Sequence, residues 1–391
     1  MKSSDLPGGM RVLHFYKTVY PDSLGGTEQF IRHLALAARK FGIDSTVLAL
    51  SDSPRPSRKI ESYTLHQAKK TFDVASMGVS IEAVGMFRRL VREADVVHYH
   101  FPWPFADLLH FAVGVSKPSI VTYHSDVVRQ RQLLRLYRPL RNRFLSSVDR
   151  IVATSPNYLA TSPVLRDLEH KVDVIPLGLD RTLYPQPDNG KLQHWDARFG
   201  RRFFLFVGVL RYYKGLHILL DACRNRDFTV VIVGAGPTEE SLKRKAAELG
   251  LRNVHFLGFL PDADKVGLLT LCAAVVFPSH LRSEAFGLTL VEGAMFGKPL
   301  ISSEIGTGSS FVNSHGETGF VIPASDSQAL ASAMQAILDQ PELGLKMGQA
   351  ANRRYSEFFT ADKMAADYAR LYSQVCVRHG SFSVEPVHHA L

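Results

Sequence analysis

The residues of this chain that could do chemistry gather most densely in one short segment. Glu284 and Glu292 are separated by seven residues, and Gly287 lies between them at a predicted loop-to-helix boundary. A glycine there lets backbone approach a ligand closely, and the amides that open the helix suit a diphosphate. Glu292, predicted in the first turn, could bind a vicinal diol, and Glu284 could bind sugar hydroxyls. Spacing alone favours a simpler interpretation, with Glu292 complementing the helix dipole and Glu284 exposed to solvent.

Three more segments carry side chains of this kind: Gly25, Gly26 and Glu28 at a predicted helix start, His124 at a predicted strand end, and Arg211 and Lys214 in FVGVLRYYKG. The two cations could offset charge that grows on a leaving diphosphate. Alternation along the strand extends to Arg211 only if the strand continues that far. Structural roles are the alternative for the first two segments: a tight turn with a dipole partner for the glycines and Glu28, and a structural strand-end residue for His124.

The elements that must position these residues alternate between short β-rich runs and amphipathic helices. Strands are predicted over residues 11–16, 45–49, 95–100, 119–124, 150–154, 172–176, 203–209, 229–233, 254–257, 273–277, 299–302 and 319–322. Helices are predicted over residues 27–41, 216–224, 239–249, 262–271, 289–296, 327–340, 343–357 and 360–375. Most of the strands are continuous apolar runs, so parallel sheets covered on both faces and built from right-handed βαβ units are expected.

A chain of 391 residues is too long for one typical core, so two domains are expected. Residues 181–200 are polar, contain two prolines and lack periodicity, and are predicted to be the linker. The first domain is predicted to hold residues 10–183 and 361–391, and the second residues 184–360. Residues 1–9 are expected to be a disordered leader. Ligands are expected in a cleft where the carboxyl ends of both sheets meet.

Composition narrows the class of protein. No run approaches the ~18 apolar residues that span a bilayer, and the N-terminus lacks a secretory signal. Cys223, Cys272 and Cys376 show no metal spacing and are expected to be buried in a reducing compartment, which predicts a cytoplasmic protein. A net charge of +9 is compatible with nucleic acid, anionic lipid or phosphorylated small molecules as partners.

In this context SEAFGLTLVEGAMFGKPLI resembles the paired-glutamate motif of retaining GT-B glycosyltransferases, family four. The resemblance runs from about Arg11 to Tyr372 and implies two Rossmann-like, doubly wound parallel-sheet domains that face a cleft. It implies that Glu284 contacts hydroxyls of the donor sugar and that Glu292 holds the ribose. The loop amides that it places at the phosphates and sugar are those of Phe286, Gly287, Leu288 and Thr289.

Other segments resemble the family in the same order along the chain. Gly25, Gly26 and Glu28 resemble a GG-x-E loop near the donor phosphates and the acceptor, and His124 resembles a histidine near the transferred sugar. Lys214 matches one of two basic residues at the diphosphate. The family has the other basic residue at the position of Val209, and Arg211 is the substitute predicted here.

The resemblance also bears on mechanism. No residue matches a family nucleophile, so front-face departure and attack are expected, with retention at the anomeric carbon. The Asp262-Ala263-Asp264 run could suggest a metal, but it opens a predicted helix and is interpreted as capping and dipole complementation. A metal-independent hexosyltransferase without a cofactor is therefore predicted.

The donor is predicted from two further segments. SSEIGTGSSFVNSHGETGFV and the opening RVLHFYKTVYPDSLGGTEQFI are similar to mannosyl- and rhamnosyltransferases of bacterial surface polysaccharides, which implies GDP-mannose or GDP-D-rhamnose and a lipid-linked glycan acceptor. A UDP-sugar transferase, a sugar phosphorylase or epimerase, and a nucleotide-sugar-binding protein without turnover remain alternatives. VIVGAGP lacks the third glycine of a dehydrogenase fingerprint, and no nucleic-acid-binding motif is present.

The basic residues are densest in the segment 127–148, which has no acidic residue and carries Arg129, Arg131, Arg135, Arg138, Arg141 and Arg143 among leucines. This pattern predicts a helix or helical pair on an anionic membrane surface. Together with the resemblance to bacterial transferases, it implies a peripheral protein at the cytoplasmic face of the inner membrane. Pro139 predicts a break within it. The alternative is an ordinary surface helix.

Overall fold

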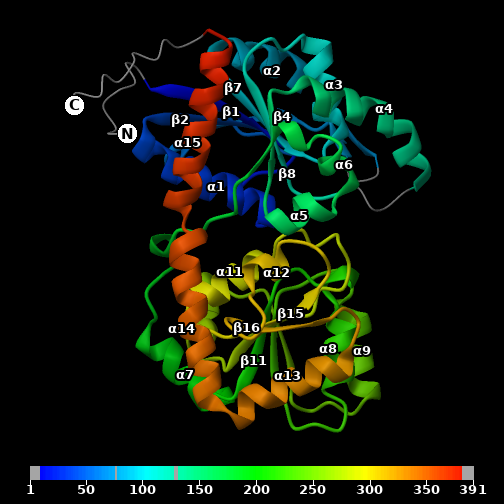
Figure 1. Cartoon of the computed structure of the whole chain (residues 1–391), viewed down its shortest axis with the longest axis vertical. Helices are drawn as coiled ribbons and strands as arrows, with labels where there is room; N and C mark the ends of the chain where they lie inside the picture. The colour runs from blue at the N-terminus through cyan, green and yellow to red at the C-terminus, as the bar shows by residue number, and fades with distance from the viewer. Residues whose placement is uncertain (1–8, 75–76, 127–130, 381–391) are drawn as a thin grey trace. The chain divides into compact units, whose positions relative to one another are not determined.

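The computed structural model describes residues 9–74, 77–126 and 131–380, which form two compact units. The first unit contains the chain up to Thr154, Ser162–Gly178 and the chain from Ala361 onward; the second contains Ser155–Thr161 and Leu179–Thr360 (Figure 1). The segments 155–161 and 179–183 thus pack with the second unit, whereas the sequence placed them in the first domain. The predicted leader lies almost wholly outside the described residues.

The first unit is built on one eight-stranded sheet of order β10-β9-β8-β7-β1-β2-β4-β3. Its strands are β1 (Met10–Phe15), β2 (Ile43–Ser51), β3 (Arg58–Ile60), β4 (Tyr63–Lys69), β7 (Val96–Phe101), β8 (Ser119–Tyr123), β9 (Arg150–Ala153) and β10 (Val172–Val174). All neighbours pair in parallel except β3 on β4. A separate hairpin joins β5 (Phe72–Val74) to β6 (Met77–Val79). The predicted strands are all present, whereas β3 to β6 were missed.

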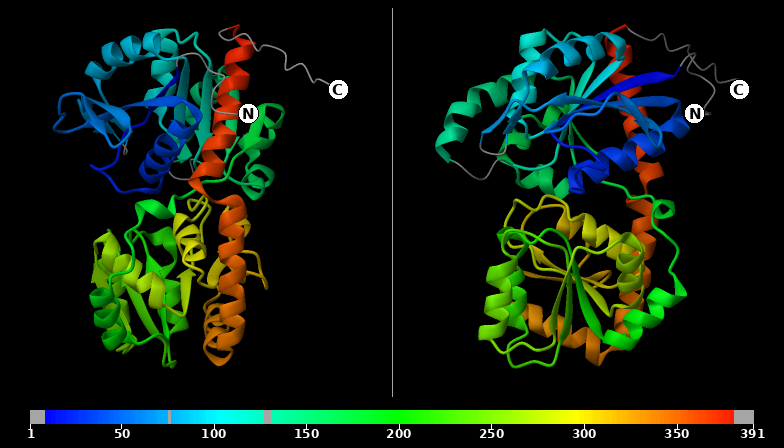
Figure 2. Two further views of the ribbon diagram at one scale, coloured as in Figure 1. Left: turned by 90° about the vertical axis from the view of Figure 1, so that its left-hand side faces the viewer. Right: turned by 180° about the vertical axis from the view of Figure 1, so that it is seen from behind.

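Helices cover both faces of this sheet. They are α1 (Gly26–Ala38), α2 (Ile81–Glu93), α3 (Pro104–Val113), α4 (Arg131–Ser147), α6 (Pro163–Arg166) and α15 (Ala361–Arg378). Alternation along β1 separates the two faces: His14 faces the side of α1 and α15, and Phe15 stacks on Phe87 of α2 at 4.5 Å. Figure 2 shows from two further sides how the helices lie against the strands.

Helix α4 runs through Pro139, so the predicted break is wrong. Proline has no backbone N–H, so the carbonyl oxygen of Arg135, four residues earlier, loses its helical hydrogen bond. Arg135 and its neighbour Leu136 are exposed, so water can satisfy that carbonyl. Arg129 of the predicted basic helix lies outside the described residues, and of Arg131 only the backbone is described.

The second unit has a six-stranded, wholly parallel sheet of order β13-β12-β11-β14-β15-β16. Its strands are β11 (Phe203–Val207), β12 (Thr229–Val233), β13 (Val254–Gly258), β14 (Ala274–Phe277), β15 (Leu300–Glu304) and β16 (Gly319–Pro323). Its helices are α5 (Pro156–Thr161), α7 (Asn189–Phe199), α8 (Leu216–Ala222), α9 (Glu239–Glu248), α10 (Asp262–Leu271), α11 (Leu288–Met295), α12 (Ser309–Val312), α13 (Ser327–Asp339) and α14 (Pro341–Phe358). The predicted helices are present, with ends that shift by a few residues.

The predicted linker contains helix α7, so its assignment as irregular chain is wrong. Trp195 of α7 is buried and donates its indole N–H to Asp264 of α10 at 3.1 Å, and Lys191 forms an ion pair with the same carboxylate at 2.9 Å. The predicted capping role of the Asp262-Ala263-Asp264 run is wrong, since Pro261 holds the cap position, whereas both aspartates lie in the first turn of α10, as predicted for dipole complementation. Asp264 also ties α10 to α7.

Two expectations from composition concern burial and membranes. The three cysteines are buried and free, as predicted. None of the described helices has the length and apolar character needed to cross a bilayer.

Candidate active site

The glycine-bearing loop after β14 has the conformation that a close backbone approach requires. Gly287 adopts φ 91°, in the left-handed region, and α11 begins at the next residue. A Cβ at Gly287 would lie 3.1 Å from both Leu290 and Phe277, so a side chain would be crowded as well as strained. The first amides of α11 have no acceptor within the helix and carry its positive dipole end. This turn can therefore bind an anion.

Glu284 lies in the same loop and is only 8% exposed, which excludes the solvent-exposed alternative. Its carboxylate forms an ion pair with Lys214, and Ser279 Oγ lies 3.4 Å from it. Lys214 ends the short helix Tyr212–Lys214 after β11, and its Nζ also lies 4.5 Å from the centre of the Phe277 ring. The structure thus brings two of the predicted residues into direct contact.

Glu292 is also 8% exposed, but it lies in the second turn of α11 rather than the predicted first turn. Its Oε1 accepts from Lys265 Nζ at 3.0 Å and from Tyr184 Oη at 2.9 Å. Burial lowers the pKa of Lys265, but the charges of Glu292 and Asp262 outweigh it and raise that pKa above its ordinary value. Burial, with the charge of Glu292, raises the pKa of Tyr184. The Oε2 atom has no hydrogen-bond partner among the described residues.

Lys265 and Tyr184 are residues that the sequence analysis missed. Lys265 follows Asp262 by three residues in a helix, a pattern typical of an ordinary surface ion pair. Tyr184 stands in the segment predicted as linker. Neither position carries a signal of function until tertiary packing brings it to Glu292.

Other predicted residues of this loop have structural side chains. Phe286 is buried and meets Phe359 edge-on at 6.0 Å, and Thr289 donates its hydroxyl to the carbonyl oxygen of Val207 at 3.0 Å. Leu288 is half-buried at the start of α11. These three residues therefore offer a ligand their backbone amides rather than their side chains.

The side chain of Arg211 lies apart from this group. It lines a hollow of about 320 Å³ with Tyr212, His217 and Lys245, and among the described residues it forms no hydrogen bond or ion pair. Strand β11 ends at Val207, so alternation does not extend to Arg211. The two residues share a turn, in which the backbone N–H of Lys214 donates to the carbonyl oxygen of Arg211 at 3.0 Å. In the part of the chain that the structure describes, no hydrogen bond joins their side chains.

In the first unit, Gly25 and Gly26 open α1, and Glu28 in its first turn is buried. Gly25 has an ordinary φ of −69°, but a Cβ there would overlap the carboxylate of Glu28. A larger residue at this position would therefore make the Glu28 side chain shift, whereas the backbone conformation itself does not need glycine. Burial and the charge of Glu28 together raise the pKa of Tyr16.

His124 follows β8, at the carboxyl edge of the first sheet. Its backbone N–H donates to Phe101 O at 2.9 Å, and its ring stands edge-on to Phe30 at 5.1 Å. Its Nε2 lies 3.1 Å from Nδ1 of His100, a buried residue that the sequence analysis did not single out. Burial lowers the pKa of His124 to about 3, so the ring is neutral at physiological pH.

Comparison with known proteins decides the family. Residues 24–183 match Glycosyltransferase Family 4, and residues 192–354 match glycosyl transferases group 1. The chain is 57% identical to D-rhamnosyltransferase WbpZ of Pseudomonas aeruginosa over 90% of this chain and 93% of that protein. It is 48% identical to the O-antigen chain mannosyltransferase C of Escherichia coli, over 93% of this chain and 98% of that protein. The chain belongs to the family 4, group 1 glycosyltransferases.

Solved structures agree with this assignment at the level of fold. Sucrose-phosphate synthase from Thermosynechococcus elongatus matches with a TM-score of 0.80 at 19% identity, over 94% of this chain and all of that one. The predicted α/β GT-B fold is therefore confirmed. The relatives and the family matches confirm the predicted glycosyltransferase function. The predicted cleft stays a prediction.

For a glycosyltransferase, the second unit offers a coherent set of groups. The α11 amides and Lys214 present positive charge, while Glu284 and Glu292 present carboxylates on either side of the turn. A nucleoside diphosphate sugar carries the complementary groups: two phosphates between two sets of hydroxyls. Each carboxylate is held by a half-buried lysine, so both are fixed in place before a ligand arrives.

Proposed function

We propose that this glycosyltransferase moves mannose or D-rhamnose from a GDP-linked donor to a lipid-linked glycan in O-antigen synthesis, with retention. The observation that carries the proposal is the pair of buried carboxylates, Glu284 and Glu292, on either side of the α11 amides. The relatives support the choice of sugar, because one is named a D-rhamnosyltransferase and the other an O-antigen chain mannosyltransferase.

In this proposal the diphosphate lies against the amides of residues 287–289, and Lys214 offsets the charge that grows as the nucleotide leaves. Glu284 grips donor sugar hydroxyls while keeping its ion pair with Lys214. Glu292 binds the ribose diol through Oε2, because Oε1 is already engaged by Lys265 and Tyr184. Gly25, Gly26 and Glu28 approach the phosphates and acceptor, and His124 hydrogen-bonds the transferred sugar.

The proposed reaction proceeds on the front face of the donor. The glutamates serve as ligands for hydroxyls and neither attacks the anomeric carbon. The departing phosphate oxygen takes the acceptor proton, and the protein acts by positioning and by electrostatics. Lys214 and the helix amides supply positive charge in this scheme, so we propose that transfer needs no metal ion.

The test is transfer with defined donors. The protein is incubated with GDP-mannose, GDP-D-rhamnose or a UDP-hexose, with and without lipid-linked acceptor, and nucleotide release is followed in buffer containing EDTA. We expect acceptor-dependent GDP release and an α-linked product by NMR. Turnover with UDP-sugars alone, or a product of inverted configuration, would overturn the donor or the stereochemical part. GDP-sugar binding without acceptor-dependent turnover would indicate a binding protein.

We also propose that the enzyme works as a peripheral protein at the cytoplasmic face of the inner membrane. Helix α4 supports this, because Arg135, Arg138 and Arg143 are exposed and Leu136 between them is 80% exposed. An exposed leucine among arginines is typical of a helix that lies on an anionic membrane surface.

A further inference from the structure

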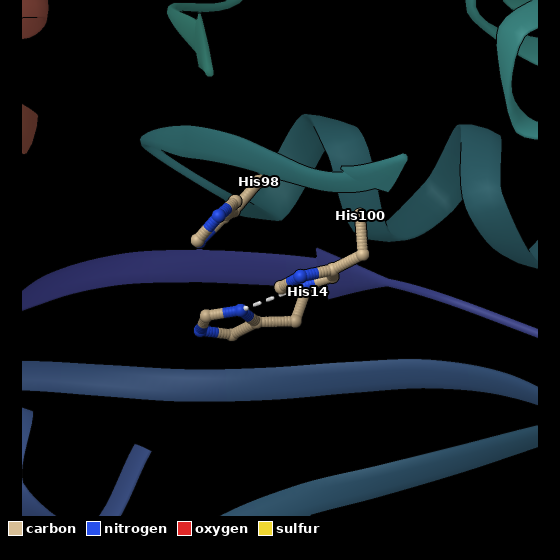
Figure 3. A group of neighbouring side chains, drawn as sticks. All are labelled: His14, His98 and His100. Carbon is tan, nitrogen blue, oxygen red and sulfur yellow. Dashed lines mark hydrogen bonds between the residues drawn. The ribbon is translucent and has the colours of Figure 1, made fainter. Parts of the chain in front are cut away.

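Four histidines lie in a row across three neighbouring strands of the first unit. His14 is on β1, His98 and His100 are on β7, and His124 directly follows β8. His14 pairs in register with His98, and His100 pairs with Thr122, two residues before His124. Because side chains alternate along a strand, all four rings project from the same face. Figure 3 shows His14, His98 and His100 gathered there.

Three of these rings form a continuous chain of hydrogen bonds. His14 Nδ1 lies 3.3 Å from His100 Nε2, and His100 Nδ1 lies 3.1 Å from His124 Nε2. His98 stays outside the chain, since its two nitrogens bond to Tyr372 Oη and Thr122 Oγ1, each at 2.7 Å. The chain leads from the buried β1 to the residue at the carboxyl edge of the sheet.

The three rings of the chain are neutral. Burial lowers the pKa of His14 to about 3 and that of His124 to about 3, and burial with the neighbouring histidines lowers that of His100 well below its ordinary value. A neutral imidazole has one N–H donor and one bare acceptor nitrogen. Only two arrangements then satisfy both bonds, with every proton directed toward His124 or every proton directed toward His14.

The far end of the chain favours one of them. Nε2 of His14 has no hydrogen-bond partner among the described residues. If the protons were directed toward His14, this nitrogen would be an N–H without a protein acceptor in a residue that is only 1% exposed, which is costly. If they are directed toward His124, it is a bare nitrogen, and His124 presents Nδ1–H at the sheet edge.

We propose that His14 and His100 are positioning residues that fix His124 as the neutral Nδ1–H tautomer, so that it offers a hydrogen-bond donor to an oxygen of the bound ligand. Only the identity of that ligand rests on the proposed function. The tautomer itself is a property of the free protein.

A divalent metal ion on His14, His98 and His100 is the competing interpretation, since ligand atoms of all three lie within 4.8 Å of one another. Such an ion would have to break one of the two short bonds of His98 and one bond of His100, because both nitrogens of each ring are already engaged. It would also bring a double charge into a buried cluster that contains no carboxylate. The hydrogen-bonded chain satisfies the same nitrogens at no such cost.

The experiment is NMR of the full-length protein with 15N-labelled histidine at neutral pH, using couplings that distinguish protonated from bare ring nitrogens. His124→Gln assigns the His124 signals. We expect a protonated Nδ1 and a bare Nε2 for His124. In His100→Phe, which keeps a ring of similar size, we expect the proton to move to Nε2 or to exchange between both nitrogens. His100→Gln, whose amide can still donate, should restore the Nδ1–H form.

His110→Phe is the matched control, because His110 is also buried and hydrogen-bonded, to Tyr99 and Ser147, but lies outside the chain. It should leave the His124 signals unchanged. A His124 proton on Nε2 in the parent protein, or no change in His100→Phe, would overturn the proposal. So would stoichiometric binding of added Zn²⁺ that shifts the ring signals of His14, His98 and His100 together.

Transfer assays keep this proposal separate from the proposed function. With an active donor, His100→Phe should lower kcat about 10-fold with little change in the donor KM, and His100→Gln should recover most of the loss. If no GDP-sugar is turned over, the proposed function fails while the tautomer result stands. If the protein transfers sugar from a GDP-linked donor but His124 keeps its tautomer in His100→Phe, the positioning role is wrong and the proposed function stands.

Discussion

The ion pair between Lys214 and Glu284 combines two requirements in one contact. Both side chains are largely buried, so each charge stabilises the other in the absence of ligand. In the proposed function each also contacts the donor, one at the phosphate and the other at the sugar. Stability and transfer should therefore respond differently when the pair is dismantled stepwise.

Lys214→Met should lower the transfer rate by about 100-fold or more, because the leaving diphosphate loses its cation. It should also lower the free energy of unfolding by about 3 kcal/mol, since Glu284 is left buried without a partner. In the double variant with Glu284→Gln, stability should largely return while transfer does not. Initial rates and urea unfolding measure the two effects.

Lys245→Met is the control, because Lys245 and Asp221 form a partly exposed pair at 2.6 Å in the same unit. Lys245→Met should change the free energy of unfolding by less than about 1 kcal/mol. Recovery of transfer in the Lys214/Glu284 double variant would contradict the role given to Lys214.

Glu292→Gln should weaken GDP binding about 10-fold, because the neutral amide accepts hydrogen bonds from a ribose less strongly than a carboxylate. Titration calorimetry with GDP measures this directly. Asp262→Asn serves as the control: Asp262 is the other carboxylate on Lys265, at 3.1 Å, but its side chain is 60% exposed. Equal losses in both variants would show that the charge on Lys265 matters rather than a contact to the ribose.

At this scale, the sequence pointed to Glu284, Glu292 and Lys214 through the resemblance of their segments to the family, since spacing alone favoured structural roles for the two glutamates. It could not find Lys265 and Tyr184, which reach Glu292 from a different helix and from a segment that looked irregular. Such contacts depend on how α10 and α11 pack, and no local pattern records that packing.

Among the elements, strands covered on both faces were predictable because they are continuous apolar runs. Strand β4 was missed because YTLHQAK interrupts that pattern with polar residues. Helix α7 was missed for a related reason: Trp195 is its only buried residue, so it has no apolar stripe of helical period.

The turn between β11 and α8 depends on Gly215, which has φ 72° and leaves no room for a Cβ beside the Pro278 carbonyl oxygen. Gly215→Ala should lower the free energy of unfolding by about 2–3 kcal/mol, through strain and displacement of the loop. Gly250→Ala has a similar φ of 67° but nothing within 4 Å of the added atom, and should cost only about 1 kcal/mol. Equal costs by urea unfolding would contradict the argument from space.

Helices α3 and α4 should give the first unit a pH-dependent stability. Asp107 of α3 accepts the hydroxyl hydrogen of Tyr137 of α4, and burial raises its pKa to about 8 against that bond. The pKa of an aspartate in the unfolded chain is about 3.9. Between about pH 4 and pH 8, Asp107 is therefore protonated in the folded state and ionised in the unfolded state. This stabilisation is complete below about pH 4 and is lost as the pH rises to about 8.

Asp107→Asn should remove this dependence, because an amide oxygen can accept from Tyr137 without ionising. The variant should exceed the parent in free energy of unfolding at both pH values, and by about 3–4 kcal/mol more at pH 8 than at pH 5. Urea unfolding at both pH values is the measurement, with the exposed Asp44→Asn as control. If the difference in free energy of unfolding between parent and variant is the same at both pH values, the role given to Asp107 is refuted.

For the whole molecule, the net charge of +9 matters through where it is placed. Arg135→Glu with Arg138→Glu on α4 should abolish most binding to vesicles that contain anionic lipid, since each basic residue near the surface contributes about 1 kcal/mol. Arg88→Glu with Arg92→Glu, exposed on α2, changes the net charge equally and should retain most binding. Sedimentation with vesicles measures the binding of both variants. Equal losses of binding would show that overall charge, rather than helix α4, is responsible.

The order of segments along the chain has a consequence for synthesis. The first unit lacks α15 until residues 361–378 have been made, yet Tyr372 on that helix bonds to His98 in its core. The second unit is complete at Thr360. A ribosome therefore finishes the later unit first, and the earlier unit waits for α15 with one side of its row of histidines uncovered.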